Sequence, residues 1–279
     1  MSASLLQQAM SPEVLDRAWR RLRNEHTPWA VGVDRDELQR HLFRHTLRMR
    51  EQILSGAYRP QPLRHFAMAK PDGGQRVLSA QYLQDKLAQR ALLIVLEPRA
   101  EAVFHEDSYA YRPNRNVQLA LARVRERVRI GLDWLVDADI HKYFDTIPHK
   151  PLLRVLKPFV RDTPAMKLIE SWIRHGTHHG SFLGTRRGIA QGAILSPMFC
   201  NLYLNQFDAM LTRANIPFVR FADDFLLFAQ ERRQAEAARA FARKALDQLG
   251  LTLHPDKTRI VRSGPKVTFL GERLPKPVR

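Results

Sequence analysis

Two adjacent aspartates, Asp223 and Asp224, lie between the apolar segments RFA and FLLF. Neighbouring carboxylates repel each other and lose hydration when their flanks are buried, unless a cation joins them. A solvated polar turn is the ordinary interpretation of an Asp-Asp pair. The apolar flanks favour instead the tip of a hairpin whose strands are buried, so the pair is a candidate site for a divalent cation.

A third carboxylate, Asp139, ends the apolar segment VDAD and begins the segment DIHKYFDTIPH. If its strand neighbours the Asp-Asp hairpin, three carboxylates can hold two Mg²⁺ ions about 3.5–4 Å apart, the arrangement for in-line nucleotidyl transfer. One ion then lowers the pKa of a 3′-hydroxyl, and the other stabilises the leaving pyrophosphate. Mn²⁺ prefers the same oxygen ligands and could replace Mg²⁺.

The overall charge favours a polyanionic partner. Lys and Arg total 45 against 28 Asp and Glu, which gives a formal charge of +17 and suits a phosphate backbone. An acidic membrane surface is the alternative, but apolar stretches such as 91–96 are soon interrupted and no signal peptide is visible. Cys200 is the only cysteine, so no internal disulfide can form. We therefore expect no membrane partner and a reducing, cytoplasmic setting.

The elements that must position the aspartates follow from periodicity and turn residues. Asp34 and Glu37 form a predicted capping box, and Ser196-Pro197 is a typical helix start. We expect helices over residues 13–24, 34–54, 83–97, most of 151–175, 196–212 and 238–249. We expect strands over residues 65–70, 75–79, 135–139, 218–222, 225–229 and 267–271. This mixed order favours an α+β chain of one large domain or two lobes.

Several ordered blocks resemble the reverse transcriptases of the bacterial group II intron-like lineage, which include CRISPR-associated enzymes. The blocks are AKPDGGQRVLS, DIHKYFDTIPH, GIAQGAILSPMFCNLYLNQFD, RFADDFLLF, GLTLHPDKT and VTFLG, preceded by AWRRLRNEHTPWAVGVD. The resemblance implies a polymerase right-hand fold with an antiparallel palm sheet packed on helices. It implies an N-terminal helical extension over 1–60, fingers over 61–130 and a palm over 131–279, with fingers-associated helices around 150–190. Only eight residues follow Gly271, so the thumb is expected to be short or lacking.

The resemblance also implies roles for individual residues. Asp139, Asp223 and Asp224 would hold the metal ions together with the backbone of Ile140, and Lys257 would lie near the leaving pyrophosphate. The residues that would bind the nucleotide are Lys70, Arg76, Phe144, Gln191 and Gly192. Phe144 would be a steric gate against ribose. The simpler interpretations are a solvated basic hairpin for Lys70 and Arg76, a core aromatic ring for Phe144 and a surface lysine for Lys257. Ser108 to Arg115, the segment SYAYRPNR, has a composition suited to contact with nucleic acid.

The implied function is RNA-directed DNA polymerisation: deoxynucleotides are added to a primer 3′-hydroxyl on an RNA or DNA template. The compact chain further resembles enzymes that work beside a CRISPR integrase, or beside another protein that supplies thumb function, and provide DNA for spacer acquisition. Three alternatives stay open: an RNA-dependent RNA polymerase, a catalytically weak, maturase-like RNA-binding module, and an antiphage polymerase that makes untemplated DNA. Phe221 replaces the tyrosine commonest before the acid pair, a change that keeps the ring.

Overall fold

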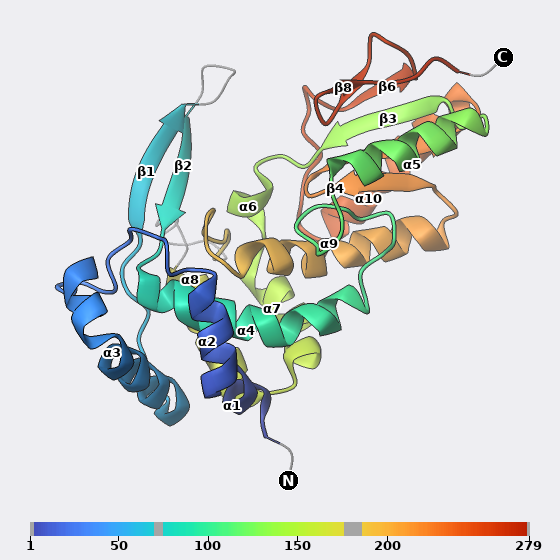
Figure 1. The fold of residues 1–279 in the computed structure, drawn as a ribbon. Coiled ribbons are helices and arrows are strands. Elements are labelled where there is room, and N and C mark those ends of the chain that lie inside the picture. The colour runs from blue at the N-terminus through green and yellow to red at the C-terminus, as the bar shows by residue number, and fades with distance from the viewer. Residues whose placement is uncertain (1–2, 70–74, 176–185, 278–279) are drawn as a thin grey trace. The chain divides into compact units, whose positions relative to one another are not determined.

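The computed structural model describes residues 3–69, 75–175 and 186–277. The chain forms two compact units, each made of two separate stretches (Figure 1). The first unit comprises Met1–Ala102 and Pro148–Phe199, and the second comprises Val103–Ile147 and Cys200–Arg279. The three candidate metal-binding aspartates all belong to the second unit, and the candidate residues near 70–76 and 191–192 belong to the first.

The first unit is mainly helical around one buried helix. Its elements are α1 (Leu5–Ala9), α2 (Pro12–Arg20), α3 (Arg35–Ser55), β1 (Arg64–Ala69), β2 (Gln75–Ala80), α4 (Leu83–Glu101), α7 (His149–Val160) and α8 (Thr163–His175). Side-chain caps set two of the helix starts: Ser11 accepts from the amide of Val14, and Asp34 accepts from the amide of Glu37 at 2.8 Å. Helices α1 and α2 pack on α4, whose buried residues cover most of its circumference.

The second unit contains a four-stranded antiparallel sheet with the order β4-β5-β3-β6. The strands are β3 (Trp134–Asp139), β4 (Phe218–Phe221), β5 (Asp224–Ala229) and β6 (Arg259–Arg262). The other elements are α5 (Val117–Arg129), α6 (Tyr143–Thr146), α10 (Arg232–Gln248) and the small hairpin β7 (Thr268–Phe269) and β8 (Glu272–Arg273). Helix α9 (Ser196–Arg213) begins in the first unit and lies mostly in the second.

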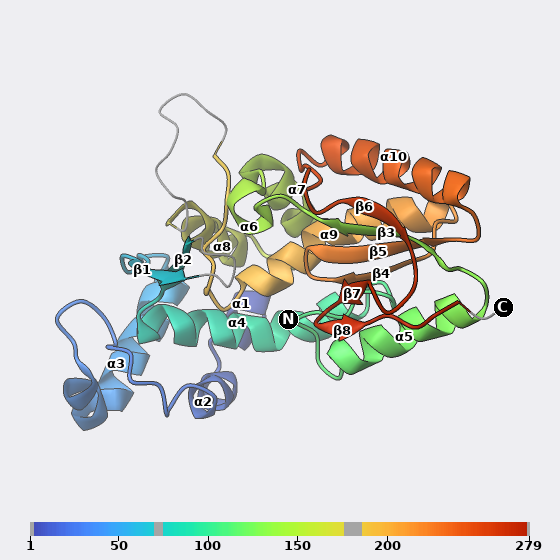
Figure 2. The same cartoon turned by 90° about the horizontal axis from the view of Figure 1, so that it is seen from above.

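Helices cover both faces of this sheet (Figure 2). Leu121 and Val124 of α5 form one core with Leu226 of β5. On the other face Phe207 of α9 packs against Phe225, with ring centroids 5.2 Å apart. Successive strand residues point to opposite faces, so β5 is apolar throughout because both of its faces are covered.

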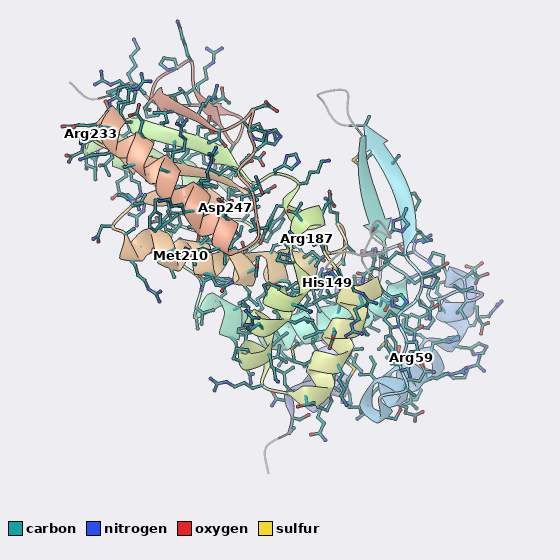
Figure 3. All side chains as sticks on the ribbon, turned by 180° about the vertical axis from the view of Figure 1, so that it is seen from behind. Arg59, His149, Arg187, Met210, Arg233 and Asp247 are labelled. Carbon is teal, nitrogen blue, oxygen red and sulfur yellow. The ribbon has the colours of Figure 1, made fainter. Side chains whose placement is uncertain are left out.

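Helix α10 lies on the same side of the sheet as α9 and contacts β3, β5 and β6 (Figure 2). Its buried residues are alanines and Leu246, and its outer surface is charged from the exposed Arg233 near the start to the exposed Asp247 near the end (Figure 3). No helix within the described residues is long and apolar enough to cross a bilayer.

Most predicted elements are confirmed, including the strands before and after the acid pair. The local structure departs from the prediction in several places. Helix α4 continues through Pro98, helix α5 was not predicted, and neither were α1 and the edge strand β6. The strand predicted over 267–271 is only two residues long, because Leu270 and Gly271 adopt left-handed backbone angles and turn the chain into β8. The α+β class is confirmed.

Candidate active site

Two of the three candidate aspartates face each other across neighbouring strands. Asp139 is the last residue of β3, Asp224 is the first residue of β5, and the two are partners in the antiparallel register. Paired residues on adjacent strands have Cβ atoms about 4.5–5.5 Å apart. The two carboxylates are therefore brought together by strand pairing alone.

The third aspartate lies in the turn that joins β4 to β5. Phe221 pairs with Asp224, so the loop consists of Ala222 and Asp223. Ala222 has φ +60°, and Asp223 is not among the residues with positive φ, the pattern of a type II′ turn. A left-handed conformation costs a residue with a side chain about 1–2 kcal/mol. The surrounding structure must hold this turn in place.

The chain that follows Asp139 is fixed on two sides. The Ile140 amide donates to the Asp223 carbonyl at 3.3 Å, which links the ends of two strands. On the other side, the His254 amide donates to the Asp139 carbonyl at 2.7 Å. These backbone bonds place the acidic positions relative to each other without using their carboxylates. The role of the Ile140 backbone as a metal ligand stays a prediction.

A lysine ammonium neutralises part of the acidic cluster. Lys257 Nζ donates to Asp139 Oδ2 at 2.6 Å, and this hydrogen bond raises the pKa of Lys257. Loss of hydration, together with the negative charges of Asp139 and Asp223, raises the pKa of Asp224 to about 7, whereas Lys257 acts in the opposite direction. Asp224 is exposed to solvent at the start of its strand. The neighbouring negative charge across the sheet comes from its register partner Asp139 on strand β3.

These residues fit a divalent cation by their chemistry. Two carboxylates face each other as register partners and a third lies in the adjoining turn, loss of hydration and the neighbouring negative charges raise the pKa of Asp224, and a cationic group already lies on Asp139. In the part of the chain that the structure describes, no three acidic, imidazole or thiol side chains are gathered tightly enough to hold one ion in this arrangement. The ammonium of Lys257 occupies Asp139 Oδ2 in this structure. Metal binding by the three aspartates stays a prediction.

The two aromatic residues after Asp139 differ in their surroundings. Tyr143 is fully buried, and its hydroxyl donates to the Cys200 carbonyl at 2.8 Å. Phe144 is partly exposed in the short helix α6, and its ring contacts Tyr143 at a centroid distance of 6.0 Å. Tyr143 therefore has a packing role. The Phe144 ring remains accessible, as a steric gate would require, although that role stays a prediction.

In the first unit, Gln191 and Gly192 lie against strand β2. The Ser79 amide donates to the Gln191 carbonyl at 2.8 Å. Gly192 has φ +104°, and a Cβ atom there would lie 2.7 Å from the Ser79 carbonyl oxygen. The resemblance implies that Gly192 binds the nucleotide. In the structure the close approach is to Ser79, and nucleotide contact by both residues stays a prediction.

The other two predicted nucleotide-binding residues belong to the β1–β2 hairpin. Arg76 pairs with Met68 in the antiparallel register of the two strands. Lys70 lies outside the described residues, as does the turn that joins the strands. Their contact with a triphosphate stays a prediction.

Sequence reasoning missed three buried polar residues, two of which hold the segment after Gly192. Gln81, Asp85 and Gln89 are buried and spaced four residues apart. The Ile194 amide donates to Gln81 Oε1 and the Leu195 amide to Gln89 Oε1, both at 3.2 Å. The three side chains line one small cavity with room for about one water molecule (20 Å³). Their helical spacing within an apolar run was the available signal.

Within the described residues, the hydrogen bonds that the Asp85 carboxylate accepts come from neutral donors. It accepts from the Tyr58 hydroxyl at 2.8 Å, the Trp172 indole at 2.9 Å and the Gln61 amide at 2.9 Å. Burial raises the pKa of Asp85, while these three donors act to lower it. The carboxylate therefore connects three separate parts of the first unit.

The segment predicted to contact nucleic acid, residues 108–115, is half buried. Tyr109 is buried, and Arg112 donates to the carbonyls of His105 and Ser108, both at 2.6 Å. Arg112 therefore serves the loop itself, and contact of the segment with nucleic acid stays a prediction. Tyr111 differs, since 56% of it is exposed.

Comparison with known proteins identifies the family to which this chain is similar. The sequence pattern of the family "Reverse transcriptase (RNA-dependent DNA polymerase)" matches residues 68–274. Protein YkfC of Escherichia coli (strain K12) is 31% identical, over 97% of this chain and 82% of YkfC. The group II intron-encoded protein LtrA of Lactococcus lactis subsp. cremoris is 32% identical over 61% of this chain.

The fold also matches a solved structure, a partial Cas6-RT-Cas1–Cas2 complex. The TM-score is 0.52 with 24% identity, over 89% of this chain and 42% of that one. This chain spans only 28% of LtrA, so the relatives differ widely in length. Because the family pattern covers most of the chain, including Asp139, Asp223, Asp224 and Lys257, the chain belongs to the reverse transcriptase (RNA-dependent DNA polymerase) family.

Proposed function

We propose that this RNA-directed DNA polymerase adds deoxynucleotides to a primer 3′-hydroxyl on an RNA or DNA template by two-metal catalysis. The register pair Asp139 and Asp224 carries the proposal, because it joins two carboxylates that strand pairing holds together. Asp223 completes the set from the adjoining turn. Two Mg²⁺ ions, or Mn²⁺ in their place, would lower the pKa of the 3′-hydroxyl and neutralise the triphosphate charge.

The chain's own residues supply the remaining steps. The primer hydroxyl gives its proton to solvent water and its oxygen forms a bond to the α-phosphorus, while the bond to the bridging oxygen of the pyrophosphate breaks. Lys257 carries a proton that it can give to the leaving pyrophosphate, once its ammonium moves from Asp139. Phe144 would exclude a ribose 2′-hydroxyl. Gln191, Gly192, Lys70 and Arg76 are proposed to bind the nucleotide and template.

Primer extension with purified protein tests the function. Matched RNA and DNA templates are each supplied with deoxynucleotides and then with ribonucleotides, so that the four combinations separate a reverse transcriptase from an RNA polymerase. Extension with no template present would indicate the untemplated alternative. RNA binding with no extension under any of the four conditions would favour a maturase-like module and contradict the proposal.

A variant pair tests the metal assignment. Asp223→Asn should lower the extension rate by about three orders of magnitude, roughly 4 kcal/mol, while primer–template affinity is retained. Asp247→Asn is the matched control, because it removes a carboxylate from the exposed surface of α10 in the same unit. Near wild-type extension by Asp223→Asn contradicts the two-metal proposal.

A finer proposal concerns the pathway. The solved Cas6-RT-Cas1–Cas2 complex contains a chain of similar fold, and this motivates the proposal that the protein supplies DNA to a CRISPR integrase. The LtrA similarity favours an intron-related role instead. Co-purification with a Cas1–Cas2 complex, and spacer acquisition that depends on Asp223, would support the first. Selective binding of a group II intron RNA, with no integrase association, would support the second.

A further inference from the structure

A charged residue lies inside the sheet next to the candidate active site. Arg220, in strand β4, is fully buried, and so is Asp208 of helix α9. The guanidinium binds the carboxylate through two bonds, Nε to Oδ1 at 2.8 Å and Nη2 to Oδ2 at 2.6 Å. Burial acts to lower the pKa of Arg220, but the charge of Asp208 raises it above the ordinary value, so the pair is ionic.

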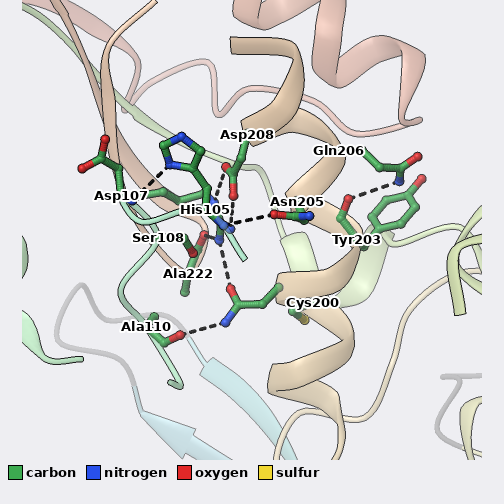
Figure 4. Close-up of polar contacts among 12 residues, drawn as sticks. His105, Asp107, Ser108, Ala110, Cys200, Tyr203, Asn205, Gln206, Asp208 and Ala222 are labelled. Carbon is green, nitrogen blue, oxygen red and sulfur yellow. Dashed lines mark hydrogen bonds and ion pairs between the residues drawn. The ribbon is translucent and has the colours of Figure 1, made fainter. Parts of the chain in front are cut away.

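The remaining nitrogen of this guanidinium reaches the acid-pair turn. Arg220 Nη1 donates to the Ala222 carbonyl at 3.0 Å and to Asn201 Oδ1 at 3.0 Å. Asn201 in turn donates to the Ala110 carbonyl at 2.8 Å (Figure 4). The Ala222 carbonyl belongs to the peptide that leads directly into Asp223. The Arg220 side chain is therefore hydrogen-bonded at once to the turn residue Ala222, which has positive φ, and to Asp208 and Asn201.

The strand itself is held by other bonds. The Arg220 amide donates to the Asp107 carbonyl, and the Tyr109 amide donates to the Arg220 carbonyl, both at 2.9 Å. Asp107 is bound by Arg123 at 2.7 Å and by Arg127. Because these bonds use backbone atoms and α5, they do not need the Arg220 side chain. Near the acid-pair turn, the contact that depends on the Arg220 side chain is its hydrogen bond to the Ala222 carbonyl.

Stability alone does not explain such a pair. Replacing a buried ion pair with apolar residues of similar volume is often neutral or stabilising, whereas removing one partner is strongly destabilising. Lysine could pair with Asp208, but it lacks the planar fork that reaches several acceptors together. The geometry calls for arginine because one rigid group donates to four acceptor atoms, which belong to Asp208, Asn201 and Ala222.

We propose that Arg220 is a positioning residue: through the Ala222 carbonyl it holds the turn that directs Asp223 and Asp224, and Asp208 and Asn201 fix its orientation. The inference rests on the proposed two-metal function, which it deepens. Removing the contact should leave the sheet intact and let the turn relax from its left-handed conformation. Metal binding and the rate of chemistry should then fall together.

The double variant Arg220→Met/Asp208→Leu separates positioning from stability. It removes both charges and keeps the interior apolar, so its melting temperature should stay near that of the wild type, whereas Arg220→Met alone should melt much earlier. Despite its stability, the double variant should bind Mn²⁺ about ten- to a hundredfold more weakly, as measured by electron paramagnetic resonance. Its kcat for extension should fall by a similar factor while KM for the deoxynucleotide stays nearly constant.

Arg220→Lys provides a second measurement if the double variant does not fold. It keeps the ion pair with Asp208 and should fold, yet it should show the same weakened Mn²⁺ binding. Leu121→Ala, in the core between α5 and the sheet, is the control for general destabilisation and should leave Mn²⁺ binding unchanged. Failure of both Arg220 variants to fold would overturn the inference, because the side chain would then hold the sheet itself.

The Mn²⁺ measurement also separates this inference from the proposed function. If the stable double variant binds Mn²⁺ and extends primers as the wild type does, Arg220 has no positioning role, and the inference fails while the function stands. If the wild type extends no primer but its Mn²⁺ binding depends on Arg220, the proposed function fails and the positioning role stands. Wild-type protein that binds no Mn²⁺ overturns both.

Discussion

Asp139 and Asp224 are the last register pair between β3 and β5, so two carboxylates distant in sequence face each other across one strand spacing. Lys257 bonds to the first, and loss of hydration together with the neighbouring carboxylates raises the pKa of the second to about 7. Because the carboxylates repel each other without a bound cation, the site should respond to pH, and metal and protons should compete for it.

The competition predicts a pH-dependent metal affinity. Below about pH 7, Asp224 carries a proton in the metal-free protein, and a metal ion must displace it. The apparent Mg²⁺ affinity should therefore fall about tenfold for each pH unit below this value, because one proton is released per binding event. Titration calorimetry at pH 6, 7 and 8 measures the dependence. A constant affinity over this range would contradict the prediction.

The same pKa shift has a defined sign for stability. The folded pKa lies above the ordinary value of about 3.9, so protonation stabilises the folded form. This contribution is fully present below about pH 4 and is lost as the pH rises through about 7. In the absence of metal, the Asp224→Asn variant should not lose this stability. Its melting temperature should therefore decrease less than that of the wild type between pH 5 and pH 8. The two proteins would behave alike if Asp224 did not titrate there.

Sugar selection should depend on the accessible ring of Phe144. An apolar ring gives a 2′-hydroxyl no hydrogen-bond partner and occupies its space. Phe144→Ala should raise ribonucleotide incorporation by one or more orders of magnitude, about 1.4 kcal/mol for each tenfold. Competitive primer extension with both nucleotide classes measures the ratio.

Tyr143 is the internal control for this experiment. It is buried and hydrogen-bonded to Cys200, so Tyr143→Ala should destabilise the folded protein by about 3–5 kcal/mol without changing sugar preference. Loss of discrimination in Tyr143→Ala, with discrimination kept in Phe144→Ala, would show that the gate is the other ring. If neither variant changes the ratio, the steric-gate hypothesis is wrong.

The close approach at Gly192 predicts a graded loss of stability. Gly56→Ala introduces a side chain at φ +77° with no neighbour within 4 Å, so it should cost only the backbone strain, about 1 kcal/mol. Gly192→Ala has the same kind of strain and in addition places its Cβ 2.7 Å from the Ser79 carbonyl. It should therefore destabilise the first unit more than Gly56→Ala does in urea unfolding. Equal costs would mean that the segment can move away from β2 freely.

Nucleic-acid binding should be dominated by counterion release because of the +17 charge. For duplex DNA, log K should fall with log salt by about 0.9 for each phosphate contacted, with little dependence on base sequence. Fluorescence anisotropy at salt concentrations from about 50 to 200 mM measures the slope. A flat dependence would exclude the electrostatic account, and strong preference for one sequence would point to direct base contacts.

The sequence by itself predicted the candidate metal site and determined most of the local structure. The acids between apolar segments indicated a metal-binding hairpin, and the periodicity of 225–229 and 238–249 predicted β5 and most of α10. These features depend on neighbours within a few residues, which is why they can be read without a fold. The missed helix α5 shows the limit, because its arginines and valines obscure an apolar face that only the sheet reveals.

Tertiary structure alone decided which distant groups meet. The register that opposes Asp139 to Asp224 and the ion pair of Lys257 with Asp139 join positions far apart in the chain. In the sequence nothing distinguishes Arg220 from the other basic residues. Its burial in an ion pair with Asp208 is a feature of the tertiary structure. Long-range pairing depends on which faces are buried together, and a one-residue shift in register would turn each side chain to the other face of the sheet.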